Sequence, residues 1–233
     1  MSDYHRFVPP MGKARYFGRT HQQIIESLPA HRLVTEAIHR HNSLAAIELA
    51  YNGMHSPNRF SRLPPLAPSH AVSDNLEPVQ ARAMDLADIR DLRRWHRDAA
   101  VRARRAGYDI VYVYAGHAYA MLHHWLSPDL NRRTDDYGGS VKNRVRLIRE
   151  LIEDAKDAVG ADTAIAFRMA VDDDGWPDPL VPRDDIGEAV SLLAELPAVK
   201  TMVHELKSSL LEAGPGQDAS LPAAAHRLIE EFM

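Results

Sequence analysis

The sequence predicts an α/β fold built on a parallel sheet, and two observations lead to this prediction. Short apolar segments of strand type alternate with longer segments of helical periodicity along most of the 233 residues, which is the pattern of βα units. The clearest apolar segment, residues 110–114, is rich in β-branched and aromatic side chains and lacks a regular polar alternation. Such a segment is typical of a strand that is buried on both faces of a parallel sheet.

The N-terminal part of the sequence is expected to form an arm followed by a helix. Residues 1–20 mix prolines, glycines and basic residues without a period and are expected to form a loop or arm. Residues 22–41 follow a helical pattern that Pro29 interrupts. One apolar face of its second part consists of Leu33, Val34, Ala37 and Ile38.

A first strand and a long loop are expected next. Residues 44–50 read as a short buried strand that carries one carboxylate, Glu48. Residues 51–84 are rich in Pro, Ser, Asn and His and predict a long irregular loop, a feature that is often functional in compact domains. A strong helix then begins at Asp85, which can cap it, and ends at Gly107.

The central strand, residues 110–114, leads into two polar side chains, Tyr114 and His117. Barrels and open parallel sheets place their chemistry at the carboxyl ends of the strands, which makes both residues candidates for a site. A long polar loop follows and ends in Tyr137-Gly138-Gly139-Ser140. Ser140 is a good N-cap for a helix over residues 141–159, which Gly160 closes.

The third strand is expected over residues 163–169 and ends near Arg168, and Asp184 opens a further helix that runs to about Leu196. From Ala198 onward the pattern offers helical fragments and no convincing strand. The expected organisation is therefore one α/β domain over residues 1–197 with about three βα units, followed by a helical tail over residues 198–233.

Composition excludes several classes of protein. The net charge of −4 does not suggest nucleic acid or an anionic membrane as a partner, and the arginine clusters at Arg93-Arg94 and Arg102–Arg105 read as a solvated helix face. The absence of cysteine excludes disulfides, thiolate metal sites and Cys-ligated iron–sulfur clusters in this chain. Adjacent side chains such as His123 and His124 rarely reach one ion, so no metal site is expected. No apolar segment approaches the roughly 18 residues of a membrane span, and no signal core is present, which favours the cytoplasm.

The segment from Asn131 to Arg144 fits the pattern N-x-R-x-D-x-Y-G-G-S-x-x-N-R, which resembles the old yellow enzyme family of FMN-dependent oxidoreductases. The pair of Tyr114 and His117 is similar to the trimethylamine and dimethylamine dehydrogenase branch of that family. The strand Ala46-Ile47-Glu48-Leu49, followed by Gly53-x-His55, also resembles this branch.

The resemblance implies a (β/α)8 TIM barrel with FMN at its C-terminal mouth. The family barrel needs eight βα units, whereas this chain is expected to hold only strands three to five, so a partial barrel is implied. Carried over by position, Glu48 would face the pyrimidine end of the flavin and Arg168 its N1–C2 edge. Tyr114 and His117 would contact the substrate over the flavin face.

Each of these side chains has a simpler interpretation. Arg168 could be a strand-end arginine that pairs with Asp172 or Asp174, and Glu48 could pair with Arg168 because a buried carboxylate needs a partner. Tyr114 and His117 could merely form hydrogen bonds at a strand end.

Two functions are compatible with the sequence. The first is an FMN-dependent oxidoreductase that transfers a hydride from a small amine to FMN. The second is a catalytically inactive remnant or an interaction fragment that self-associates or needs a companion polypeptide to complete the barrel, because open sheet edges invite association.

Overall fold

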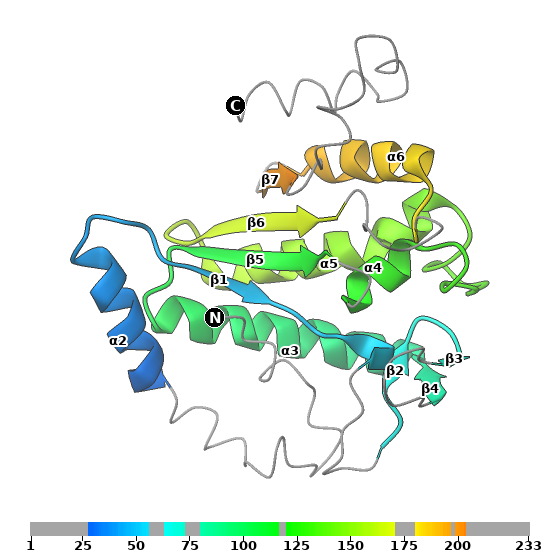
Figure 1. The fold of residues 1–233 in the computed structure, drawn as a ribbon, viewed down its shortest axis with the longest axis horizontal. Helices are drawn as coiled ribbons and strands as arrows, with labels where there is room; N and C mark the ends of the chain where they lie inside the picture. The colour runs from blue at the N-terminus through cyan, green and yellow to red at the C-terminus, as the bar shows by residue number, and fades with distance from the viewer. Residues whose placement is uncertain are drawn as a thin grey trace.

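The computed structural model describes residues 28–55, 63–72, 80–116, 120–170, 180–196 and 199–203. These residues form an α/β fold around a four-stranded parallel sheet, as the sequence predicts (Figure 1). The strand order is β1-β5-β6-β7, and the strands are β1 (Ala46–Leu49), β5 (Ile110–Ala115), β6 (Ala164–Met169) and β7 (Val199–Val203).

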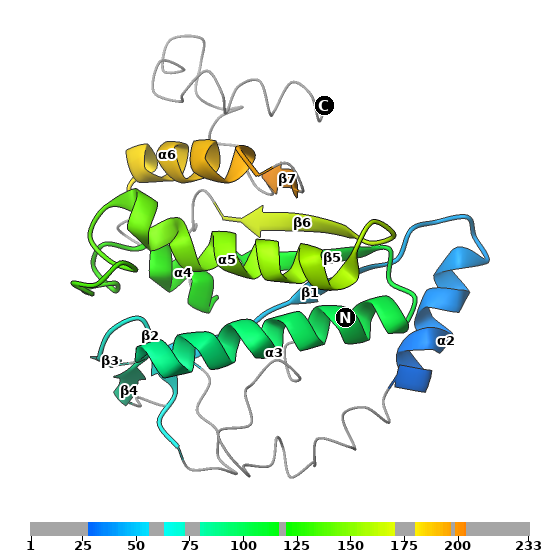
Figure 2. The same ribbon diagram turned by 180° about the vertical axis from the view of Figure 1, so that it is seen from behind.

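Helices cover one face of this sheet. In Figure 1 the strands β5 and β6 lie in front of helix α5, and in the view from behind α5 lies in front of them (Figures 1 and 2). The helices of this layer are α3 (Leu86–Arg105), α5 (Val141–Val159) and α6 (Arg183–Ala194). On β5, Val111, Val113 and Ala115 are fully buried and join the apolar core that these helices form with the sheet.

The opposite face of the sheet carries the alternate residues of each strand. Burial alternates along β5, where Tyr112 and Tyr114 are half-buried between fully buried neighbours. Glu48 on β1 and Arg168 on β6 are half-buried in the same way. Because Glu48 is in register with Tyr112 and Tyr114 with Arg168, all four residues share one face of the sheet.

The two main helices begin and end where the sequence predicts. Asp85 caps α3 through a capping box, in which its side chain accepts a hydrogen bond from the backbone N–H of Asp88 and the Asp88 side chain accepts one from Asp85. The Ser140 hydroxyl accepts a hydrogen bond from the Asn143 N–H at the start of α5. Gly160 ends α5 with a φ of 72°, a conformation that glycine adopts without strain.

Residues 51–84 are more regular than expected. Within them lie a 3₁₀ turn, η2 (Gly53–His55), and three short strands, β2 (Leu66–Ala67), β3 (Ala71–Val72) and β4 (Gln80–Ala83), which form a second sheet in the order β2-β4-β3. The expectation of a purely irregular loop is therefore wrong. Strands of two residues are too short to leave a period in the sequence.

The polar loop after β5 also contains a helix that the sequence analysis missed. Helix α4 (Met121–Leu126) is buried at all six residues, and Trp125 is among the largest fully buried side chains of the described structure. Its backbone is anchored at the start by a hydrogen bond of 2.7 Å from the Met121 N–H to the carbonyl of Tyr51.

The expectation that no strand follows residue 197 is wrong. Strand β7 pairs with β6 in parallel over five register positions, from Ile165 opposite Val199 to Met169 opposite Val203. The sheet therefore continues past the boundary expected at residue 197. The rest of the expected tail, residues 204–233, lies outside the described residues, as does the expected N-terminal arm.

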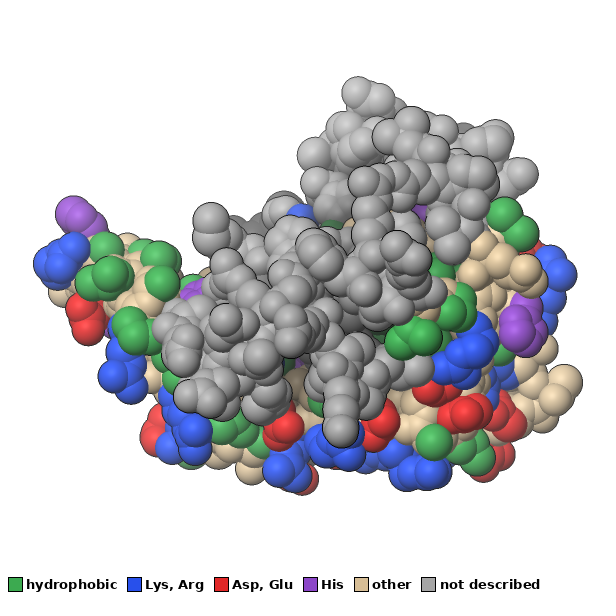
Figure 3. All heavy atoms as spheres, turned by 90° about the horizontal axis from the view of Figure 1, so that it is seen from below, with side chains coloured by type: hydrophobic (Ala, Val, Ile, Leu, Met, Phe, Trp, Pro, Cys, Tyr) green, Lys and Arg blue, Asp and Glu red, His purple; other side chains and the backbone are tan. Residues whose placement is uncertain are grey.

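Helix α2 (Leu28–His39) packs against the body through Thr35 together with the partly buried Leu28 and Ile38. Thr35 is buried and its hydroxyl donates to the carbonyl of Ala106 at 2.7 Å. Leu33 and Val34, from the apolar face expected on this helix, are exposed. Figure 3 shows hydrophobic side chains gathered at the end of the molecule that α2 forms. No helix in the described part of the chain is long and apolar enough to cross a membrane.

Candidate functional site

An ion pair joins the two outer strands of the β1-β5-β6 trio across the central one. Arg168 Nη1 donates to Glu48 Oε1 at 2.6 Å. Tyr112 on β5 lies opposite Glu48, and Tyr114 lies opposite Arg168, so the ion pair crosses β5 between these two tyrosines. Three strands therefore contribute side chains to one spot at the carboxyl end of the sheet, where parallel sheets place their chemistry.

The Arg168 guanidinium also lies over the Tyr114 ring, with its carbon 5.5 Å from the ring centroid. This distance is within the range of a cation–π attraction, which orients both groups. The side chains of Arg168 and Glu48 keep 23% and 29% of their surface exposed, so solvent screens the pair and its contribution to stability is small. The arrangement is therefore accessible to a ligand.

Three of the four site residues expected from the sequence, Glu48, Tyr114 and Arg168, lie together in this arrangement. The fourth, His117, lies outside the described residues, and so do Asp172 and Asp174, the other partners considered for Arg168. Of the simpler interpretations, the pairing of Glu48 with Arg168 is confirmed.

The donor set of Arg168 is suited to a flavin. Within the described structure, Arg168 forms its hydrogen bond through Nη1, which leaves Nε and Nη2 available to a ligand. A guanidinium is permanently charged and presents a rigid fork, which suits the electron-rich N1–C2 edge of an isoalloxazine ring. The free oxygen of Glu48 can accept from a ring N–H, so the residues present fit FMN.

Tyr112 is a further residue of this face that the sequence analysis did not single out. It lies opposite Glu48 on β1 and opposite Ala166 on β6, on the same face as Tyr114. The spacing of two residues could have identified it, because it places Tyr112 and Tyr114 on the same side of the strand. The apolar segment was instead interpreted as a strand buried on both faces.

The sequence pattern that carries the family resemblance has a structural role here. Asn131 donates through Nδ2 to the carbonyls of Trp125 and Tyr137, both at 2.8 Å. Arg144, whose side chain is 5% exposed, donates to the carbonyls of Gly139 and Leu126 and to Asp185. These bonds tie α4, the following loop, α5 and α6 to one another.

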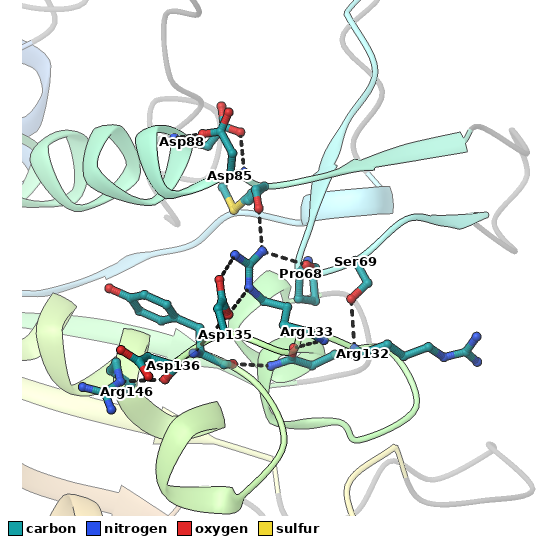
Figure 4. Close-up of polar contacts among 12 residues, drawn as sticks. Pro68, Ser69, Asp85, Asp88, Arg132, Arg133, Asp135, Asp136 and Arg146 are labelled. Carbon is teal, nitrogen blue, oxygen red and sulfur yellow. Dashed lines mark hydrogen bonds and ion pairs between the residues drawn. The ribbon is translucent and has the colours of Figure 1, made fainter.

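Arg133 fixes the same loop to the second sheet (Figure 4). Its guanidinium donates to both oxygens of Asp135 and to the carbonyls of Pro68, beside β2, and Met84, beside β4. This hydrogen bond from Arg133 lowers the pKa of the Asp135 carboxyl. The Arg132 N–H adds a hydrogen bond of 2.9 Å to Ser69.

The loop leaves no room for a side chain at Gly138. A Cβ there would overlap the carbonyl of Arg133, and the Asn143 amide donates to the Gly138 carbonyl at 3.0 Å. Next to it, the Tyr137 hydroxyl donates to Glu150 at 2.9 Å, and burial followed by this hydrogen bond raises the pKa of Tyr137 to about 12. A phenol with such a pKa stays protonated at neutral pH and acts as a donor.

Three buried histidines lie near the second sheet. The rings of His55 and His124 meet edge to face with centroids 5.1 Å apart, and His123 is also buried. Among the residues that the structure describes, no group of three or more His, Cys, Asp or Glu side chains could hold a metal ion.

Comparison with known proteins identifies the relatives of this chain. The model of the NADH:flavin oxidoreductase / NADH oxidase family matches residues 20–213. Dimethylamine dehydrogenase of Hyphomicrobium sp. (strain x) is 39% identical over 147 residues, which cover 60% of this chain and 20% of that protein. An NADH oxidase of Thermoanaerobacter brockii is 33% identical over 190 residues, covering 81% of this chain and 27% of that protein.

Solved structures show the same relationship. Histamine dehydrogenase from Rhizobium sp. 4-9 superimposes with a TM-score of 0.69 at 39% identity, over 77% of this chain and 26% of that one. The old yellow enzyme homologue from Zymomonas mobilis has a TM-score of 0.63 at 24% identity, which shows the fold alone, over 87% of this chain and 58% of that one.

The chain spans about a fifth to a quarter of the length of its amine dehydrogenase relatives. The resemblance to the old yellow enzyme family, with amine dehydrogenases among the relatives, is confirmed. The chain belongs to the NADH:flavin oxidoreductase / NADH oxidase family.

Proposed function

We propose that this chain binds FMN on the face of Glu48, Tyr114 and Arg168 and that its reaction is the oxidation of a small amine by hydride transfer to FMN. The observation that supports this most is the ion pair of Glu48 and Arg168 over β5, with Tyr114 against the guanidinium. The family and the amine dehydrogenase relatives support the same cofactor and substrate class.

Arg168 and Glu48 would hold the pyrimidine end of the cofactor. Arg168 would donate from Nε and Nη2 to the N1–C2 edge, and its charge would stabilise the negative charge that a reduced flavin carries there. Glu48 would accept from a ring N–H while it keeps Arg168 in place. FMN, when bound, supplies the hydride acceptor.

Tyr114 and His117 would handle the substrate. The phenol of Tyr114 can orient an amine nitrogen by a hydrogen bond, and an imidazole titrates near neutral pH and can take up a proton from the amine. A neutral amine lone pair assists departure of the hydride from the adjacent carbon, so removal of this proton promotes the reaction.

We further propose that the four parallel strands are consecutive strands of a (β/α)8 barrel. The parallel β1-β5-β6-β7 order, with helices on one face and polar side chains on the other, supports this assignment. The structural relatives support it as well.

The test is an FMN titration of the purified chain, followed by anaerobic addition of dimethylamine or histamine. We expect retention of flavin after desalting and bleaching of its visible absorbance by an amine. Arg168→Met should weaken FMN binding by at least about tenfold, or about 1.4 kcal/mol. The matched control is Arg149→Met, because Arg149 lies on α5 and forms only a surface pair with Glu153.

If the chain retains no flavin, FMN-dependent activity of this polypeptide is excluded, and the alternative of an inactive or partner-dependent fragment takes its place. If flavin binds but Arg168→Met and Arg149→Met bind it equally well, the proposed location of the cofactor is wrong. If flavin binds at this site but no amine bleaches it, the proposed substrate class is wrong.

A further inference from the structure

Tyr112 lies on the same face of the sheet as Tyr114, two residues earlier on β5. It is in register with Glu48 on β1 and with Ala166 on β6. Neighbouring strands are about 4.8 Å apart, so side chains in register on one face are direct neighbours. The Tyr112 side chain is therefore placed next to the Glu48 side chain, on the side of the central strand.

Two tyrosines on β5 bracket the ion pair of Glu48 and Arg168. Arg168 is in register with Tyr114, and its guanidinium carbon is 5.5 Å from the centroid of the Tyr114 ring. Glu48 starts opposite Tyr112, which is about 6.6 Å further back along the strand. The pair therefore runs diagonally across β5, with Tyr114 toward the carboxyl end of the sheet and Tyr112 toward the amino end.

Tyr112 supplies the bulk next to Glu48 on these three strands. Ala166, its neighbour in register on β6, carries only a methyl group. The side chains of Glu48 and Arg168 keep 29% and 23% of their surface exposed, and an ion pair of this kind is weakened by solvent and by the freedom of its side chains. A ring on the amino side of the pair limits both losses, because it occupies space into which water or the carboxylate would otherwise move.

We propose that Tyr112 is a positioning residue of the flavin site, which holds the Glu48 carboxylate against Arg168 and so fixes the direction of the guanidinium donors. This inference rests on the proposed function, because the groups that Tyr112 positions are those proposed to bind the pyrimidine end of FMN. The bulk of the ring has this effect rather than the hydroxyl. Tyr112→Phe should therefore preserve the arrangement, and Tyr112→Ala should loosen it.

The first experiment needs no flavin. Nitrogen-15 relaxation of the Arg168 Nε–H group, assigned by the loss of its signal in Arg168→Met, reports how firmly the guanidinium is held. We expect its order parameter to fall by about a third in Tyr112→Ala, the difference between a rigid and a flexible N–H group, and to stay unchanged in Tyr112→Phe. The matched control is Tyr108→Ala, which truncates a 5% exposed tyrosine that contacts His31 before the start of β5 and should leave the Arg168 signal unchanged.

The second experiment measures FMN binding by the same variants. The dissociation constant should rise about tenfold in Tyr112→Ala and less than about threefold in Tyr112→Phe and Tyr108→Ala. An equal rise in Tyr112→Ala and Tyr108→Ala would reflect a general loss of stability and would overturn the positioning role. Circular dichroism and the thermal midpoint confirm that each variant is folded. Tyr112→Thr, with a β-branched side chain that suits a strand, replaces Tyr112→Ala if that variant is unfolded.

The two experiments separate this inference from the proposed function. If the unaltered chain binds no FMN, the proposed function fails, while the relaxation of Arg168 still decides whether Tyr112 holds the ion pair. An Arg168 group that is as rigid in Tyr112→Ala as in the unaltered chain overturns the inference even where FMN binds. A more mobile Arg168 with unchanged FMN affinity removes Tyr112 from the flavin site. A Tyr112→Phe variant that behaves like Tyr112→Ala overturns the role of the ring.

Discussion

At the scale of single residues, His96 is the most strongly buried titratable group of the helix layer. It lies on α3 with 1% of its surface exposed, and burial lowers the pKa of its ring to about 4, which the nearby Asp154 offsets only in part. The folded protein therefore holds this histidine neutral at pH values where an exposed imidazole would be charged.

This burial predicts loss of stability in acid. The folded-state pKa of about 4 lies below the ordinary value of 6.5, so the unfolded chain binds the proton first and the free energy of unfolding falls as the pH drops from 6.5 toward 4. His96→Leu should flatten the pH dependence over this window, as measured by urea unfolding at several pH values. His41→Leu, at an exposed position, is the control and should leave the slope unchanged. Equal slopes in all three proteins would contradict the prediction.

The residues of the candidate site were predictable to the extent that each breaks a local pattern. Glu48 stands out as the one carboxylate of an apolar strand, and Arg168 as a guanidinium at a strand end. Tyr112 did not stand out, because an aromatic residue in an apolar strand looks like core. Whether a strand is covered on both faces depends on what packs against the sheet, and that information is not local.

At the scale of elements, Arg144 connects several helices to one another. It reaches the end of α4, the loop before α5 and the start of α6 from a single position on α5. The three separated acceptors need the fork of a guanidinium, which an ammonium group cannot reproduce.

Arg144→Lys should therefore destabilise the protein by about 2–3 kcal/mol, because an ammonium group cannot serve the buried Leu126 carbonyl together with the part-buried acceptors of Gly139 and Asp185. Chemical denaturation with the Trp signal gives the free energy of unfolding. Arg149→Lys on the same helix, where the partner Glu153 lies at 3.9 Å, should change it by less than about 0.5 kcal/mol. A difference between the two variants of less than about 1 kcal/mol would mean that water or neighbouring side chains replace the lost donors.

Helices whose first residue is preceded by a capping side chain were predictable, and elements without such a residue were not. Asp85 and Ser140 mark the starts of α3 and α5, and both caps form as expected. Helix α4 has no side-chain cap, and its six residues are too few for a period to be read. Strand β7 begins two residues after Pro197 and carries Lys200 and Thr201, so its apolar character is diluted although its pairing with β6 is regular.

At the scale of the whole molecule, the strands of the four-stranded sheet differ in how many neighbouring strands they pair with. Within the described structure, β5 and β6 each pair with two strands, whereas β1 and β7 each pair with one. The core formed by β5, β6 and α5 is also where the fully buried side chains concentrate.

Amide hydrogen exchange should follow this distribution. We expect the slowest exchange in β5 and β6, where amides open only with global unfolding, and exchange at least about tenfold faster in β1 and β7. Mass spectrometry on proteolytic fragments resolves the four strands. Protection of β1 equal to that of β5 would show that a further strand or a partner covers that edge.

The order of strands and helices along the chain was enough to predict a parallel α/β sheet, because alternation constrains topology. The number of strands in the parallel sheet was underestimated by one, since β7 lies in a stretch that reads as helical fragments. The direction in which α2 faces could not be predicted either, because the inward position of Thr35 depends on an acceptor, the Ala106 carbonyl, that is far away in the sequence.

The close approach at Gly138 has a consequence for how this chain can vary over generations. Every replacement at this position adds a Cβ that collides with backbone, not with a side chain that could rotate away. A single amino-acid substitution there is therefore strongly destabilising by itself. Only a lineage that first rebuilds the path of the chain around Arg133 gains any freedom at residue 138.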